Sequence, residues 1–97
     1  MTEREKSLRE KLTERKSLLD DYFRSKYLSR EIDGRAFFQS KKGAVFTVDT
    51  FEYFGSIVLE YAASFENAPG GWEDGSLHSI DLSEQDMIKA LEEEINN

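Results

Sequence analysis

The residues with the clearest catalytic potential lie near position 80. His78 is the only histidine in the chain, and Ser76 and Asp81 lie within three residues of it. These are the residue types of a hydrolytic triad, in which a base activates a serine and a carboxylate orients the base. All three fall within six positions of a predicted strand, where successive side chains point to opposite faces and cannot converge in that order. We therefore expect no catalytic residue and a protein that is not an enzyme.

Acidic side chains form the second set of chemically useful residues. Asp81, Glu84 and Asp86 cluster at the start of a predicted helix, and Glu73 and Asp74 precede them. Carboxylates bind divalent cations, but the alternating acids followed by glycine that form a calcium loop are missing from this sequence. The chain contains no cysteine and a single histidine, which excludes the usual zinc sites. We expect neither a metal nor a cofactor.

The same acids could instead contact another protein. Trp72 precedes two of them in a segment rich in glycine. Tryptophan is enriched at binding hot spots, although folding back over the core is the alternative for this residue. Three glutamates lie near the negative end of the last predicted helix, where acids are mildly destabilising, which suggests that they have a use there. The predicted partner-binding residues are Trp72, Glu73, Asp74, Asp81, Glu84, Asp86, Glu92, Glu93 and Glu94.

Charge is divided unequally along the chain, whose net charge is -7. Residues 1–43 hold twelve of the thirteen lysines and arginines against eight acids, whereas residues 44–97 hold one lysine against twelve acids. A surface of one sign steers association with a partner of the opposite sign. This division favours a basic protein partner. Pairing of the two halves within the fold is the alternative.

The N-terminal cations alternate with glutamates, and Glu5 and Arg9 have the spacing of a favourable helical pair. A face that binds nucleic acid is usually purer in sign, so we expect no direct contact with nucleic acid. The sequence lacks an apolar run near the ~20 residues that span a bilayer, and no signal-peptide core follows the N-terminus. We expect a cytoplasmic protein that does not bind membranes.

Two helices are predicted at the ends of the chain. Thr2 and Glu5 have the spacing of a capping box, and the first helix is expected to end near Tyr27. Its apolar stripe packs into the core in our interpretation, because Arg15 and Lys26 fall on the seam that a coiled coil would need. The stripe comprises Leu8, Leu12, Leu19, Phe23 and Tyr27. The last helix is capped by Ser83 and has the buried stripe Met87, Ile88, Leu91 and Ile95.

Strands are predicted between these helices. Residues 36–40 and 44–48 indicate a hairpin around Gly43. Residues 49–65 fit either a helix or a strand at 56–62 that follows Gly55, and the strand is favoured because glycine weakens a helix. A short strand is expected at 77–80. The predicted fold is a single small α+β domain over residues 1–97, with a long N-terminal helix, an antiparallel sheet of three to four strands and a C-terminal helix.

The C-terminal 40 or so residues carry a resemblance. The order of residues 57–62, then Glu73-Asp74-Gly75, then Leu82-Ser83-Glu84 before a helix with Glu94-Ile95, resembles small uncharacterised acidic proteins of Gram-positive phages and mobile elements. This resemblance implies a biological setting and assigns no chemistry.

These observations favour a small acidic protein-binding module. The main hypothesis is an inhibitor of the anti-CRISPR, immunity or DNA-mimic type, whose carboxylates take phosphate positions on the basic, nucleic-acid-facing surface of a larger protein. A nuclease or another nucleic-acid-binding protein would be such a partner. The alternative is a structural or regulatory interaction protein that forms a homodimer, or binds a partner, through its first helix.

Overall fold

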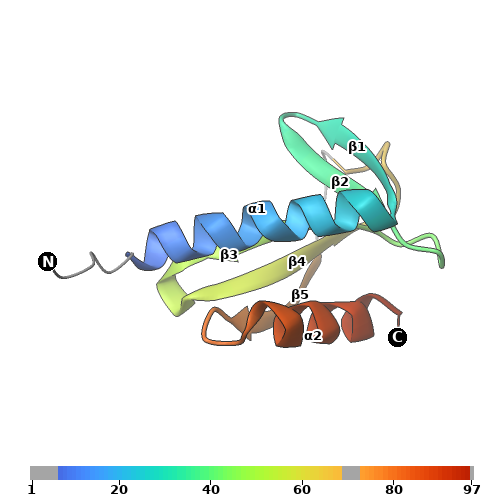
Figure 1. Cartoon of the computed structure of the whole chain (residues 1–97). Coiled ribbons are helices and arrows are strands. Elements are labelled where there is room, and N and C mark those ends of the chain that lie inside the picture. The colour runs from blue at the N-terminus through green and yellow to red at the C-terminus, as the bar shows by residue number, and fades with distance from the viewer. Residues whose placement is uncertain (1–6, 69–72, 97) are drawn as a thin grey trace, which may run out of the picture.

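The computed structural model of the chain describes residues 7–68 and 73–96. Two helices accompany a five-stranded antiparallel sheet in which each strand pairs with its neighbour in sequence (Figure 1). The predicted α+β class is therefore confirmed, with one strand more than expected. In chain order the elements are α1 (Leu8–Lys26), β1 (Leu28–Ile32), β2 (Arg35–Gln39), β3 (Val45–Phe51), a 3₁₀ turn (Glu52–Phe54), β4 (Ser56–Ala62), β5 (Glu73–Ser79) and α2 (Glu84–Asn96).

Helix α1 begins after Ser7, whose side-chain oxygen accepts a hydrogen bond of 3.1 Å from the Glu10 amide. This bond satisfies one of the amides that a helix start leaves without a partner. The helix ends at Lys26, as expected, because Tyr27 adopts an extended conformation. The capping box predicted at Thr2 and Glu5 lies outside the described residues.

The strand missing from the sequence prediction is β1. It is joined to β2 by Asp33 and Gly34, whose φ angles of 51° and 78° are both positive. Two central residues with positive φ form the tight turn that matches the twist of a hairpin, and Asp-Gly is a preferred pair for it. Residues 28–32 have apolar side chains only at Leu28 and Ile32 and lack an aromatic run, so this dipeptide was the signal that the prediction overlooked.

The remaining strand predictions agree with the structure in type. The hairpin around Gly43 joins β2 to β3, and its glycine has a φ of 94°. Gly55, with a φ of 59°, lies between the 3₁₀ turn and β4, so the strand interpretation of residues 56–62 is correct and the helix is wrong. β5 starts four residues earlier than the strand expected at 77–80.

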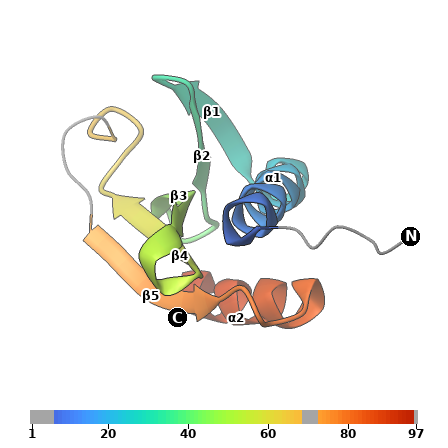
Figure 2. The same cartoon turned by 90° about the vertical axis from the view of Figure 1, so that its left-hand side faces the viewer.

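Both helices pack on the same face of the sheet (Figures 1 and 2). Phe23 of α1 is fully buried among aromatic rings of the sheet. Of the stripe predicted for α1, only Leu8 is exposed, so a partner helix could reach the other residues only by opening the core. The core cluster contains Leu12, Leu19, Phe23, Tyr27, Ala36, Phe38, Phe46, Val48, Ile57, Leu59, Met87, Leu91 and Ile95.

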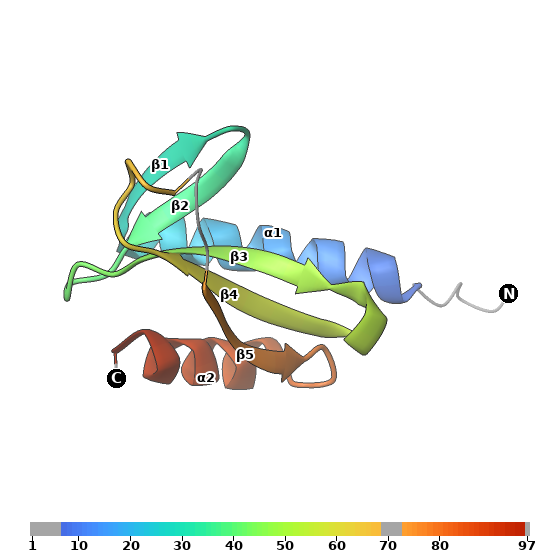
Figure 3. The same cartoon turned by 180° about the vertical axis from the view of Figure 1, so that it is seen from behind.

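Among the described residues, no helix covers the opposite face of the sheet (Figure 3). Where β2 meets the start of β3 and the end of β4, this face carries a second small cluster, in which Phe37 and Val45 pack with Ala68 and Ala62. Residues 63–68 after β4 therefore cover this part of the face, and no described segment covers the part toward the turn between β3 and β4. Neither helix in residues 7–68 and 73–96 has the length and apolar character needed to cross a membrane.

Candidate protein-binding face

The open part of the helix-free face contains a groove of about 310 Å³. The strand register creates it, because Val58 of β4 lies opposite Asp49 of β3 on one side and opposite Leu77 of β5 on the other. Glu60, two residues further along β4, is opposite Asp74. Because alternate residues of a strand share a face, these side chains line one hollow. The residues that line the groove are Asp49, Phe51, Val58, Glu60, Asp74, Gly75 and Leu77.

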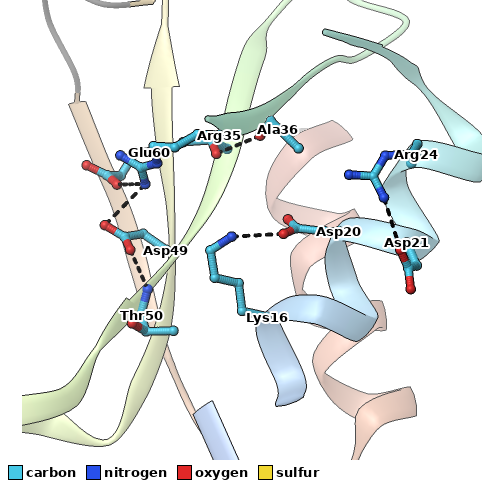
Figure 4. Close-up of polar contacts among 10 residues, drawn as sticks. Lys16, Asp20, Asp21, Arg24, Arg35, Ala36, Asp49, Thr50 and Glu60 are labelled. Carbon is cyan, nitrogen blue, oxygen red and sulfur yellow. Dashed lines mark hydrogen bonds and ion pairs between the residues drawn. The ribbon is translucent and has the colours of Figure 1, made fainter. Parts of the chain in front are cut away.

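An arginine from β2 reaches the acids at one side of the groove (Figure 4). One Arg35 nitrogen lies 3.3 Å from an oxygen of Asp49 and 3.0 Å from an oxygen of Glu60. The second oxygen of Asp49 accepts the Thr50 amide at 2.8 Å. Asp74 is exposed on β5 and has no ion pair among the described residues. Two of the three carboxylates thus share one guanidinium and the third has none in the described part of the chain, which leaves the groove negative.

Burial and the neighbouring charges also affect the protonation of Glu60. Burial raises the pKa of the Glu60 carboxyl above its ordinary value, and its hydrogen bond to Asp49 raises it further. Arg35 opposes both effects without cancelling them. A further cation in the groove would favour the ionised form of Glu60, because an opposite charge at short range stabilises a carboxylate.

Exposed apolar side chains border this groove. Phe51 stacks on Phe54 with 5.1 Å between ring centroids, and Tyr53 meets Phe54 edge-on. We call these three residues, at the turn between β3 and β4, the aromatic tip. Tyr53 is 88% exposed, Phe54 58% and Leu77 of the neighbouring strand 49%. Contiguous exposed apolar groups rimmed by polar residues are typical of protein interfaces.

The residues predicted from sequence occupy several separate places. Asp74 lines the groove, and Glu73 is exposed at the start of β5. Trp72 lies outside the described residues. Around the start of α2, Asp81, Glu84 and Asp86 are exposed, and the Asp86 amide donates to Ser83, which confirms the predicted cap.

Glu84 borders a different hollow, of about 380 Å³, between α1 and the start of α2. This hollow is lined by two cations, Lys11 and Arg15, and two acids, Glu14 and Glu84. Arg15 also donates a hydrogen bond of 3.0 Å to the Leu82 carbonyl. Balanced charges give this hollow little preference for a basic partner.

Two of the three C-terminal glutamates, Glu92 and Glu94, form hydrogen bonds within the protein. Glu92 accepts hydrogen bonds from Lys26, at 2.7 Å, and from the Tyr27 hydroxyl, at 3.0 and 3.1 Å. These bonds join α2 to the end of α1. The hydrogen bond to Glu92 is the largest cause of a raised Lys26 pKa. Glu93 is exposed.

Glu94 joins α2 to the sheet. It accepts the Tyr61 hydroxyl of β4 and the Ser76 amide of β5, the latter at 3.2 Å, and pairs with His78 at 3.0 Å. Burial and Glu94 together raise the pKa of Tyr61. Gly75 makes this approach possible, since a Cβ there would collide with Glu94 and lie 3.0 Å from the Leu59 carbonyl oxygen.

Replacing Glu94 with alanine is expected to lower the free energy of unfolding by about 2–3 kcal/mol, because a charged acceptor is lost and partly buried donors remain without a partner. Equilibrium urea denaturation measures the change. Glu93→Ala is the matched control, and we expect it to stay within about 0.5 kcal/mol of wild type because Glu93 is exposed. Equal effects of the two substitutions would contradict the role given to Glu94.

Ion pairs also connect the basic and acidic halves of the chain. Arg9 lies 3.6 Å from Glu52, in addition to the pairs made by Lys26 and Arg35. Pairing within the fold therefore accounts for part of the charge division. The predicted acids that remain exposed are Glu73, Asp74, Asp81, Glu84, Asp86 and Glu93.

Most residues of the groove were not predicted from the sequence. Arg35, Asp49 and Glu60 lie on three strands, and only the register of the sheet brings them together. A signal was present, since Asp49 and Glu60 are charged residues in strands that are otherwise largely buried. A buried strand tolerates such residues only when they face a partner or solvent.

The fold and the groove define a small α+β protein with an acidic, partly apolar sheet face. In the part of the chain that the structure describes, no group of three His, Cys, Asp or Glu residues could hold a metal ion. Comparisons with protein-family models, with curated proteins and with solved structures found no match to this chain.

Proposed function

We propose that this protein is an acidic module that binds a basic protein through the helix-free face of its sheet. The observation that carries the proposal is the groove, in which one arginine pairs with only two of three carboxylates beside the exposed aromatic tip. Exposed aromatic residues serve as anchors in many interfaces, and charges around them select the partner. The aromatic tip supplies such an anchor, and the acidic groove supplies the charges beside it.

The partner we propose is a protein whose basic surface normally meets nucleic acid. Carboxylates of Asp74, Asp49 and Glu60 would then occupy the positions at which the partner normally binds phosphate groups, and binding would inhibit the partner. The net charge of -7 supports this direction, because it disfavours direct contact between this chain and nucleic acid. A nuclease is one partner of this kind.

The outward side of α2 is a weaker candidate for this contact. Glu92 and Glu94 are engaged within the protein, and Lys89 lies between the exposed acids Asp86 and Glu93. None of the large exposed apolar residues among the described parts of the chain belongs to α2. A helix face without an apolar anchor gives a partner little to bury.

Affinity capture from the native host tests the proposal. Tagged wild-type protein, Asp74→Lys and the control Asp86→Lys are compared; both substituted aspartates are exposed, and the change in charge is the same. We expect wild type and Asp86→Lys to capture a basic protein that Asp74→Lys loses. Added salt should weaken that complex, because exposed charges are screened. Nucleic acid should displace the protein from its partner.

Two outcomes would reject the proposal. One is a partner lost from Asp86→Lys and retained by Asp74→Lys, which would place the contact on α2. The other is tight binding of the isolated protein to DNA or RNA in a gel-shift assay at about 150 mM salt, where screening leaves only strong phosphate contacts.

A further inference from the structure

We propose that the groove receives an arginine side chain of the partner. In this arrangement the guanidinium lies between Asp74 and Glu60, and the aliphatic part of the side chain lies on Leu77 and Phe51. The inference deepens the proposed function and rests on it, since it assumes that this face meets the partner. It identifies the chemical group that the face recognises.

The arrangement of charge favours one more cation. Arg35 approaches from β2 and contacts Asp49 and Glu60, so it occupies one side of the acid cluster. Asp74 stands opposite Glu60 on β5, at the other side. A second guanidinium placed there would complete a row of alternating charges across four strands. The pKa of Glu60 is raised first by burial and then by the neighbouring Asp49 carboxyl, and a cation beside Glu60 would oppose both effects.

Size and shape favour a single long side chain. The groove, at about 310 Å³, is at the lower end of the ~300–1,000 Å³ typical of ligand sites, which leaves little room for a nucleotide or a large cofactor. Its walls combine carboxylates with the ring of Phe51, which is stacked on Phe54. A guanidinium can use both, by pairing with the carboxylates and by lying on the ring.

Arginine fits these walls better than lysine does. A planar guanidinium can form paired hydrogen bonds to carboxylates while its face lies on an aromatic ring. A lysine ammonium is compact and strongly hydrated, so it gains less from such a wall. Arg35 already shows that this surface holds a guanidinium between two carboxylates from neighbouring strands.

Titration with small amides tests this inference without the partner. The ¹⁵N-labelled full chain is titrated with N-acetyl-arginine amide, N-acetyl-lysine amide and N-acetyl-citrulline amide, and amide chemical shifts are followed. Citrulline retains the shape of arginine and lacks its charge. We expect millimolar affinity for the arginine amide, with shifts centred on Asp74, Gly75 and Leu77. The lysine amide should bind at least about threefold more weakly, and the citrulline amide at least about tenfold more weakly, a difference of about 1.4 kcal/mol.

Asp74→Asn should weaken binding of the arginine amide at least fivefold, whereas Asp86→Asn should leave it unchanged. Equal affinity for arginine and citrulline amides, equal affinity for arginine and lysine amides, or shifts confined to α2 would each overturn the inference. If Asp74→Lys abolishes partner capture and the arginine amide fails to bind, the inference falls and the proposed function stands. If the amide binds and capture is insensitive to Asp74→Lys, the proposed function falls instead.

Discussion

Phe23→Ala is expected to lower the free energy of unfolding by about 3–5 kcal/mol, the usual cost of deleting a large buried ring. The side chain of Phe23 is fully buried. Its ring centroid lies 5.1–5.9 Å from those of Tyr22, Tyr27, Phe38 and Phe46. Truncation therefore leaves a cavity where α1 meets the sheet. Urea denaturation followed by circular dichroism measures the loss.

Leu28→Ala provides the control for this prediction. Leu28 is 62% exposed on β1, so its truncation should change stability by less than about 0.5 kcal/mol. Sedimentation of both variants separates the core role of α1 from an interface role. If Phe23→Ala converted a dimer into an equally stable monomer, the apolar stripe of α1 would be an interface between copies, contrary to the packing described above.

Combining Asp74→Lys with Phe54→Ala is expected to reduce affinity for the captured partner at least about a hundredfold. Reversing a charge inside a contact and truncating an aromatic anchor each cost about 2 kcal/mol or more in well-packed interfaces. Both residues are exposed, so the free protein should keep its fold. Isothermal titration calorimetry measures the affinity, and circular dichroism checks the fold.

The matched control for that variant is Asp86→Lys combined with Leu28→Ala. It makes the same change of charge and removes an exposed apolar side chain, at sites away from the groove. We expect its affinity to remain within about threefold of wild type, because charges outside the contact act through a screened long-range field. Similar losses in both double variants would show that overall charge, rather than the groove, determines binding.

Local sequence patterns predicted the elements whose signal lies within a few residues. Leu12, Leu19 and Phe23 repeat with the helical period, and Gly55 separates the 3₁₀ turn from β4. β1 was missed because its five residues lack the apolar run of a buried strand. It lies at the edge of the sheet, where such a run is not needed.

The acidic residues differ in how far a short sequence pattern can place them. Glu92 directly follows the buried Leu91 and Glu94 directly precedes the buried Ile95, so both lie beside the core, whereas Glu93 is exposed. Helical periodicity predicted the buried stripe of α2, and the same period indicates which acids border that stripe. Asp49, Glu60 and Asp74 differ, because only long-range strand pairing places them together. Register depends on the whole sheet, which no short window of sequence contains.

The contact between α2 and the end of the sheet also bears on aggregation. β5 is an edge strand, and edge strands offer free backbone groups on which a strand from another molecule can assemble. Between Val58 and Glu60 a register shift interrupts its pairing with β4, and the Ser76 amide is already bonded to Glu94. A foreign strand would therefore have to displace a charged side chain and follow an irregular backbone. The C-terminal helix thereby hinders chain-to-chain growth of the sheet into fibrils at this edge.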